Sequence, residues 1–154
     1  GIIHVGTNLG EQARIYYDNQ VNHVLWLDRN RSNLSELYNK TKQYPLRQQY
    51  VTETFLDKDV KDVSKTFDNF QKENIARLPI EYYDTLIIDV DDGSEFKVLA
   101  GFENNLRRSP AFIKRVLTKV RGTDDMDKYL AQFGFKQSLS SLNEISWGDA
   151  LYTR

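Results

Sequence analysis

The 154-residue chain contains no cysteine, and this absence excludes several kinds of site. Disulfide bonds, thiolate zinc sites and thiol nucleophiles all require cysteine, so none of them contributes here. Histidine is also scarce, because the chain has only His4 and His23, and both fall within predicted strands. Two separate histidines do not supply a multi-histidine metal site. The composition therefore predicts no thiolate or multi-histidine metal centre.

The chain also lacks an excess of charge of either sign, with 21 basic and 22 acidic residues and a formal net charge of −1. No overall electrostatic field therefore favours nucleic acid or an anionic membrane as a partner. No apolar run approaches the roughly 20 residues that span a bilayer, and no basic segment followed by an apolar core begins the chain. We expect a soluble, cytoplasmic protein with one domain, residues 1–154.

Two glycines four residues apart, Gly6 and Gly10, separate an initial apolar run from a helical pattern. This order predicts a strand, a tight turn and a helix, and glycine in such a turn lets a ligand approach the main chain. A second predicted strand, residues 23–28, ends in Asp28. Its distance from the turn matches the carboxylate that binds ribose hydroxyls in nucleotide-binding βαβ units. The pattern predicts a ribose-containing ligand; the alternative is a structural turn with Asp28 as a solvated acid.

The glycine spacing distinguishes two classes of ribose-containing ligand. Dinucleotide-binding folds use Gly-x-Gly-x-x-Gly, whereas this turn has Gly-x-x-x-Gly, with Thr7 and Asn8 in the loop. Fewer glycines leave less room for a pyrophosphate group. An adenosine ligand without phosphates, above all S-adenosylmethionine, therefore suits the turn better than NAD.

Three carboxylates lie at the end of the most apolar predicted strand, residues 83–90, whose continuous apolar run is typical of a parallel sheet covered on both faces. They are Asp89, Asp91 and Asp92, and such crowding raises at least one pKa unless a cation is present. The cluster can hold a general base, an acid that binds hydroxyl groups or a divalent ion. The alternative is a polar strand end at which Asp92 and Ser94 cap the next helix.

Strands and helices alternate along the rest of the chain. The remaining predicted elements are helices at 31–42, 63–77, 95–106 and 124–133, a charged loop at 57–62, strands at 46–55 and 112–120, and a final hairpin of 135–139 with 150–153. We predict an α/β fold with a doubly wound, mostly parallel open sheet of about seven strands and a C-terminal antiparallel hairpin. Ligands of such sheets bind beyond the carboxyl ends of the strands.

A series of short segments matches, in order, the motifs of one family. The segments are Ile3-His4-Val5-Gly6-Thr7-Asn8-Leu9-Gly10-Glu11, Leu25-Trp26-Leu27-Asp28 with Asn33-Leu34 and Leu37, Thr66-Phe67-Asp68-Asn69-Phe70, Ile88-Asp89-Val90 with Asp92-Gly93-Ser94-Glu95, Val98-Leu99-Ala100-Gly101, and Trp147-Gly148-Asp149-Ala150-Leu151-Tyr152. Together they resemble the FkbM-type S-adenosylmethionine-dependent methyltransferases, which have a class I, Rossmann-like fold. The resemblance implies a cofactor site and an active site whose residues are Gly6, Asn8, Gly10, Asp28 and Asp89, with Glu95 nearby.

Four features depart from the family's pattern. His4 stands where many members have an acid that contacts the methionine end of the cofactor, and Lys119 replaces an acid typical of the fifth strand's end. One residue is inserted between Asp89 and Glu95, which leaves open which of the acids between them takes the family's acidic position. The segments after the third strand and after the fifth strand, which normally help cover the substrate, are shorter than usual.

The expected reaction is methyl transfer from S-adenosylmethionine to a hydroxyl of a small molecule or sugar. Asp89 is the candidate base, and Asp92 or Glu95 orients the acceptor. One alternative is an inactive domain of the same fold that binds an adenosyl ligand or a protein. A weaker alternative is a magnesium-dependent phosphatase of the haloacid-dehalogenase type that uses Asp89 and Asp91, although its Asp-x-Asp motif belongs on the first strand of the domain.

Overall fold

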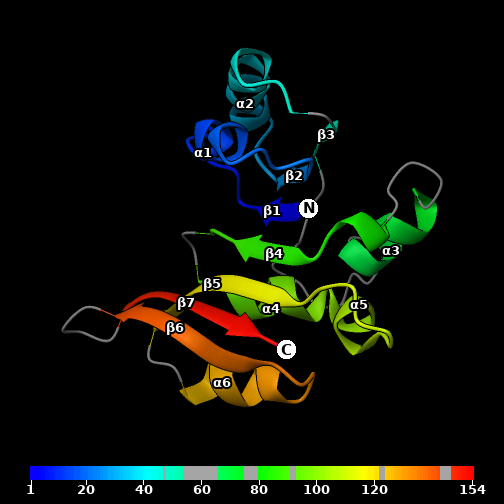
Figure 1. Ribbon diagram of the computed structural model, residues 1–154, viewed down its shortest axis with the longest axis vertical. Helices are drawn as coiled ribbons and strands as arrows, with labels where there is room; N and C mark the ends of the chain where they lie inside the picture. Colours follow the sequence, from blue (N-terminus) through cyan, green and yellow to red (C-terminus); the bar gives the residue numbers. More distant parts are fainter. Residues whose placement is uncertain (47, 54–65, 75–79, 91–92, 122–123, 143–146) are drawn as a thin grey trace.

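Seven strands form one sheet in the computed structural model, which describes residues 1–46, 48–53, 66–74, 80–90, 93–121, 124–142 and 147–154. The strand order is β3-β2-β1-β4-β5-β7-β6 (Figure 1). The strands are β1 (Ile2–Val5), β2 (His23–Asp28), β3 (Gln48–Glu53), β4 (Thr85–Ile88), β5 (Arg115–Arg121), β6 (Lys136–Leu142) and β7 (Trp147–Thr153). Strands β1 to β5 pair in parallel, and β7 pairs antiparallel with β5 and β6. The predicted sheet and its C-terminal hairpin are confirmed.

Helices lie on both sides of this sheet. They are α1 (Ala13–Asp18), α2 (Arg31–Gln43), α3 (Phe67–Glu73), the 3₁₀ turn η2 (Ile80–Tyr82), α4 (Glu95–Ala100), α5 (Glu103–Arg107) and α6 (Asp124–Ala131). The chain first winds outward from β1 to β3 and then returns to β4 on the other side of β1. This reversal between β1 and β4 is the place where doubly wound sheets bind ligands.

Alternate side chains of β1, β2 and β4 pack into two separate cores, one on each face of the sheet. On one face, Trp26 of β2 packs with Tyr16 of α1 and Leu37 of α2. On the other face, the larger core joins the strands to α3, α4, α5 and α6 and includes Leu86 of β4 and Phe102. Figure 1 shows α1 and α2 beside β1 to β3, and α4, α5 and α6 beside the rest of the sheet. The continuous apolar run of β4 therefore serves both cores, because Leu86 and Ile88 lie in the larger core and Ile87 packs against the smaller one.

The helix predicted over residues 95–106 is wrong as a single element, because the structure divides it into α4 and α5. The buried carboxylate of Asp68 in α3 accepts hydrogen bonds from the backbone N–H groups of Asn104 (2.8 Å) and Asn105 (3.3 Å). It thereby caps the N-terminus of α5. Phe102, between the two helices, stacks on Phe67 with ring centroids 4.0 Å apart. A tertiary cap and a core contact override the local helical periodicity.

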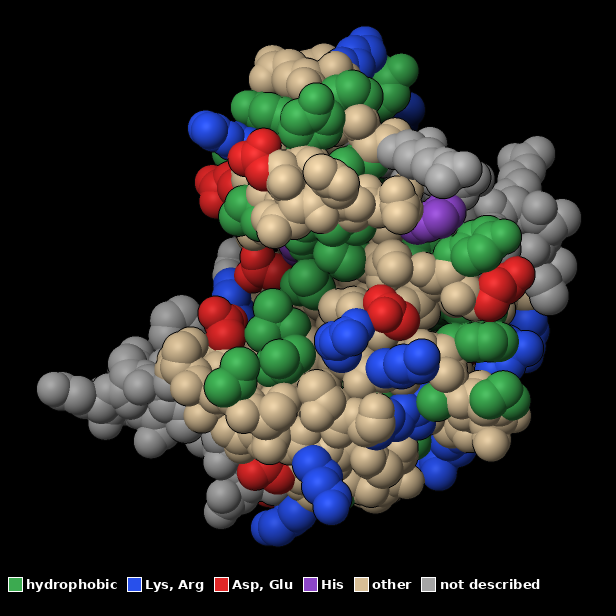
Figure 2. Space-filling view, in the orientation of Figure 1, with side chains coloured by type: hydrophobic (Ala, Val, Ile, Leu, Met, Phe, Trp, Pro, Cys, Tyr) green, Lys and Arg blue, Asp and Glu red, His purple; other side chains and the backbone are tan. Residues whose placement is uncertain are grey.

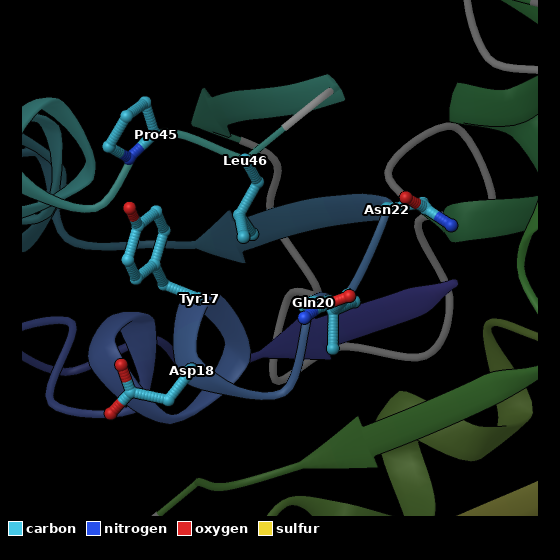
Figure 3. A pocket seen from close by; sticks show the side chains of 7 residues that line it. Tyr17, Asp18, Gln20, Asn22, Pro45 and Leu46 are labelled. Atoms are coloured by element: carbon cyan, nitrogen blue, oxygen red, sulfur yellow. The ribbon is translucent and has the colours of Figure 1, made fainter.

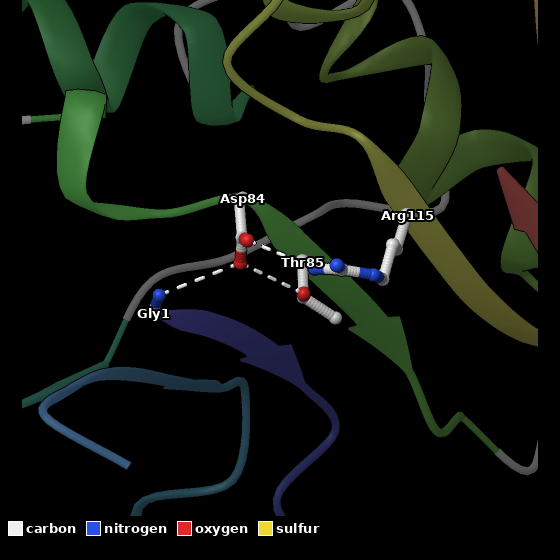
Figure 4. Close-up of polar contacts among 4 residues, drawn as sticks. All are labelled: Gly1, Asp84, Thr85 and Arg115. Atoms are coloured by element: carbon white, nitrogen blue, oxygen red, sulfur yellow. Dashed lines mark hydrogen bonds and ion pairs between the residues drawn. The ribbon is translucent and has the colours of Figure 1, made fainter. Parts of the chain in front are cut away.

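Asp84 ties together the amino ends of three strands (Figure 4). Its carboxylate accepts hydrogen bonds from the Arg115 guanidinium and from the Thr85 hydroxyl, each at 2.9 Å, and lies 3.4 Å from the Gly1 amino group. Burial raises the pKa of Asp84, but these hydrogen bonds and positive charges outweigh it, and the net shift is downward. The carboxylate therefore fixes the starts of β1, β4 and β5 relative to one another.

Some predicted features lie outside the described residues. They include the charged loop at 57–62, the two acids Asp91 and Asp92, and the ends of the helix predicted at 63–77. Within the described part of the chain, no helix combines the length and apolarity needed to cross a membrane.

Candidate functional site

The carboxyl ends of β1, β2 and β4 meet at one edge of the sheet. The register pairs Val5 of β1 with Leu27 of β2 and with Ile88 of β4, so the residues that follow these strands begin at the same level. Backbone hydrogen bonds continue the pairing past the strands, since the Gly6 N–H donates to the Leu27 carbonyl (2.9 Å) and the Asp89 N–H to the Val5 carbonyl (2.8 Å). The structure thus brings the glycine turn, Asp28 and Asp89 to one edge, where acidic and basic side chains lie side by side at the left of Figure 2.

Both glycines of the turn are needed for close contacts within the chain. Gly6 has φ +79°, and a Cβ there would lie 2.2 Å from the carbonyl oxygen of Asp89. Gly10 has φ +70°, and its Cβ would lie 2.7 Å from a methyl carbon of Leu37 in α2. Between them Asn8 also adopts a positive φ of +46°. Both glycines therefore have a role within the fold itself, beside any contact with a ligand.

Asp28 is buried at the end of β2, with 6% of its surface exposed. Its Oδ2 accepts hydrogen bonds from the backbone N–H (2.9 Å) and the hydroxyl (3.0 Å) of Thr7, and from the Asn33 amide (3.3 Å). Its Oδ1 accepts one from the Asn30 N–H at 2.7 Å. The carboxylate therefore connects the β1 turn to the start of α2, and it is not the solvated acid of the alternative interpretation.

Asp89 pairs with two residues that sequence reasoning did not assign to it. Its Oδ1 lies 2.7 Å from the Lys119 ammonium, and its Oδ2 accepts a 3.4 Å hydrogen bond from the Gln12 amide. Asp89 and Lys119 each keep 21% of their side-chain surface exposed. The parallel register pairs Ile88 with Thr118, so the next residues of β4 and β5 are also neighbours. The register of β4 against β5 would have identified this ion pair. A single sequence does not give that register.

His4 is fully buried in β1, as expected for a core residue. Its Nδ1 lies 2.8 Å from the Tyr16 hydroxyl, and its ring stacks on Trp26 with centroids 5.2 Å apart. Burial lowers the pKa of His4 to about 4, against the opposing effects of the Asp89 and Asp28 charges and the Gly6 backbone. Burial also raises the pKa of Tyr16. At neutral pH the His4 imidazole is therefore neutral. Many FkbM-type methyltransferases, which the sequence resembles, have an acid at this position.

Two buried polar atoms at this edge have no hydrogen-bond partner among the described residues: Nε2 of His4 and Oε1 of Gln12. Both residues interact with Asp89, His4 through its charge and Gln12 through the amide contact. Buried polar atoms are almost always paired in folded proteins, and exceptions mark a site that a water, ion or ligand completes. Gln12 Oε1 can accept a hydrogen bond and His4 Nε2 can donate or accept one, so the two atoms fit the polar groups of an adenosyl ligand beside the turn and Asp28.

The remaining predicted site residues are less closely grouped. Glu95 is the first residue of α4 and is partly buried, whereas Asp92 lies outside the described residues. Among the residues that the structure describes, no group of three or more histidines and acids could hold a metal ion. Of the three acids predicted as a cluster at the end of β4, Asp89 lies within the described residues and Asp91 and Asp92 lie outside them.

A pocket of about 440 Å³ lies at the opposite edge of the sheet (Figure 3). Its lining comes from the end of α1, the loop before β2 and the loop before β3, and consists of Tyr17, Asp18, Gln20, Val21, Asn22, Pro45 and Leu46. These loops precede the amino ends of β2 and β3, so the pocket is separate from the edge that carries Asp28 and Asp89. In Figure 3 the Asp18 side chain points away from Tyr17 and Leu46.

Comparison with solved structures finds methyltransferases of low sequence identity. TrmK of M. capricolum in complex with S-adenosyl-homocysteine aligns at a TM-score of 0.64 with 12% identity, covering 99% of this chain and 61% of its own. A ribosomal protein L11 methylase from Lactobacillus delbrueckii subsp. bulgaricus gives 0.66 and 13%, covering 99% and 68%. A precorrin-6y C5,15-methyltransferase from Geobacter metallireducens gives 0.56 and 10%, covering 99% and 79%.

These similarities establish the Rossmann-like methyltransferase fold. The chain spans about three fifths of the length of the TrmK chain. No protein-family model matches the sequence, and no curated protein matches it either. The fold therefore agrees with the FkbM resemblance. The similar structures do not distinguish the FkbM family from other methyltransferases of the same fold.

Proposed function

We propose that the chain is an S-adenosylmethionine-dependent methyltransferase that binds its cofactor at the carboxyl edge of the sheet and methylates a hydroxyl oxygen of a small molecule or sugar. The observation that carries this proposal is the convergence of the Gly6 turn, Asp28 and Asp89 where the strand order reverses between β1 and β4. The solved structures support it, because the three named above are methyltransferases and one holds S-adenosyl-homocysteine.

The acceptor is the less constrained part of the proposal. Among the similar structures, one is named for methylating ribosomal protein L11 and another for methylating precorrin-6y, so this fold serves acceptors of very different size. The formal net charge of −1 gives this chain no general attraction for nucleic acid. A small or sugar acceptor is consistent with that balance and with the FkbM resemblance.

In this proposal each residue at the edge has a separate task. The backbone of the turn from Gly6 through Asn8 to Gly10 lies against the cofactor, and Asp28 accepts hydrogen bonds from its ribose hydroxyls. The unpaired atoms of His4 and Gln12 bind polar groups of the same ligand. Either Glu95, at the start of α4, or Asp92 orients the acceptor.

The bound cofactor supplies a methyl group activated by a positively charged sulfur, so the protein has mainly to align the acceptor oxygen with it. With the cofactor held at this edge, Asp89 would accept the proton of the acceptor hydroxyl as its oxygen is methylated. Oδ1 of Asp89 is held by Lys119 at 2.7 Å, whereas the Gln12 contact with Oδ2 is longer, at 3.4 Å. Oδ2 is therefore the oxygen that receives the proton.

Calorimetric titration with S-adenosylhomocysteine tests the cofactor site. We expect micromolar binding to the wild-type chain and loss of at least tenfold in affinity in Asp28→Asn, because the amide supplies only one acceptor oxygen. The matched control is Asp18→Asn, which changes an exposed acid of α1 at the opposite edge and should bind as wild type. Circular dichroism must show that both variants fold. Absence of binding to the folded wild-type chain would refute the proposal.

The base assignment needs its own test, made with an acceptor found by screening hydroxylated compounds. Asp89→Asn should lower the rate of methyl transfer while leaving the affinity for S-adenosylhomocysteine within a few fold of wild type. Methyl transfer that continues at the wild-type rate in Asp89→Asn would exclude Asp89 as the base.

A further inference from the structure

One oxygen of the Asp28 carboxylate already has more hydrogen-bond donors than lone pairs. Each carboxylate oxygen offers about two acceptor positions. Oδ2 receives three bonds, from the Thr7 N–H and hydroxyl and from the Asn33 amide, whereas Oδ1 receives one, from the Asn30 N–H. The residue is buried, with 6% of its surface exposed. A ribose diol that donates one hydroxyl to each oxygen finds a free position at Oδ1 but must displace a donor of the chain at Oδ2.

The four donors differ in how easily they can leave. Two are backbone N–H groups, of Thr7 and Asn30, and their positions are fixed by the β1 turn and by the start of α2. The other two are side-chain groups that can rotate away, the Thr7 hydroxyl at 3.0 Å and the Asn33 amide at 3.3 Å. Both of these bind Oδ2. The Thr7 bond is the shorter one and lies wholly in the interior, because Thr7 has no exposed surface.

We propose that the Thr7 hydroxyl occupies an acceptor position of Asp28 that a vicinal diol must take, so that Thr7 sets the affinity of the site for ribose-containing ligands. This inference rests on the proposed cofactor site at Asp28. Thr7 acts as an internal stand-in for one ribose hydroxyl: it satisfies the buried carboxylate in the free protein and competes with the ligand. A ligand without the diol does not compete for this position, and Thr7 leaves its affinity unchanged.

Thr7→Val is the variant that isolates the hydroxyl, because valine keeps the shape of threonine and the backbone N–H bond to Asp28. Titration of wild type and variant with S-adenosylhomocysteine should give about tenfold tighter binding to Thr7→Val, the factor that corresponds to one hydrogen bond to a charged group. An analogue that lacks both ribose hydroxyls should bind the two proteins equally. Thr7→Ser retains the hydroxyl and should restore the wild-type affinity for S-adenosylhomocysteine.

The outcomes separate this inference from the proposed function. Equal or weaker binding of S-adenosylhomocysteine to folded Thr7→Val would overturn the competition, while the cofactor site would stand as long as Asp28→Asn lost binding. A gain of the same size for the hydroxyl-free analogue would also overturn it, since the effect would then not depend on the diol. If none of the folded proteins, wild type included, bound S-adenosylhomocysteine, the cofactor site and this inference would fall together. Should Thr7→Val fail to fold, Asn33→Leu tests the same competition at the second side-chain donor of Oδ2.

Discussion

Replacement of Asp68 by alanine should destabilise the protein by about 3 kcal/mol, because this carboxylate holds α5 to α3. The buried side chain accepts bonds from the N–H groups of Asn104 and Asn105 and from the Asn105 amide at 2.5 Å. Each of the two N–H groups that lose a partner contributes about 1 kcal/mol, and the loss of a negative charge at a helix N-terminus contributes about 0.5 kcal/mol. The cavity left by the missing carboxyl group accounts for the remainder. The Asn105 amide keeps Gln71 as a partner at 3.1 Å and adds little.

Urea denaturation followed by circular dichroism at neutral pH measures this loss. Asp68→Asn retains one acceptor oxygen and should lose roughly half as much stability as the alanine variant. Asp18→Ala removes an exposed acid and is the control, with an expected change within about 0.5 kcal/mol. A loss in Asp68→Ala no larger than in this control would refute the view that a tertiary cap divides α4 from α5.

The remaining predictions concern single positions. Gln20→Gly should stabilise the protein by about 0.5–1 kcal/mol in thermal denaturation, because Gln20 adopts φ +54° after α1 and glycine does so without strain; a lower melting temperature would contradict this. Asp84→Asn should cost about 0.5 kcal/mol at neutral pH, since its partner Arg115 is half exposed. The pKa of Asp84 is lowered in the folded state, so the stabilisation by its carboxylate is present above about pH 4 and disappears as the pH falls below it. Denaturation measured over a range of pH should therefore show the stabilities of the wild type and Asp84→Asn converging in acid. Gly6→Ala should cost more than 2 kcal/mol, because its Cβ would lie 2.2 Å from the Asp89 carbonyl oxygen; unfolding at the wild-type urea concentration would show that the turn can relax.

The sheet and the edge that carries the candidate site were predictable because both follow from local patterns. Alternation of apolar strands with helical segments identifies a doubly wound sheet, and parallel strands necessarily place their carboxyl ends together. That rule is sufficient to group Asp28, which ends β2, with Asp89, which follows β4. The N-cap of α2 is equally local, because Asn30 accepts a 3.0 Å bond from the Ser32 N–H two residues later.

The features that sequence reasoning missed all depend on contacts between distant segments. The packing of a Leu37 methyl group of α2 against Gly10 depends on the placement of that helix. The division between α4 and α5 depends on Asp68, more than thirty residues earlier in the chain. The Asp89–Lys119 pair depends on the register of two neighbouring strands. Periodicity and motif spacing contain no information on any of these contacts, so a single sequence could not reveal them.

The two carboxylates of the candidate site, Asp28 and Asp89, differ in the hydrogen bonding of the groups around them, and this difference affects how a ligand would bind. Three donors from the chain already bind Oδ2 of Asp28, so a ligand gains at that oxygen only by exchanging one hydrogen bond for another. Around Asp89, by contrast, His4 Nε2 and Gln12 Oε1 lie buried and unpaired among the described residues, and a ligand that pairs them removes an existing cost. In the proposed cofactor site we therefore expect the net gain on binding to come from the β1 and β4 side of the edge, and the β2 side to select for the diol. A ligand that reaches only Asp28 exchanges bonds without this gain, which is why the site favours one that extends from a ribose to the polar groups beside Asp89.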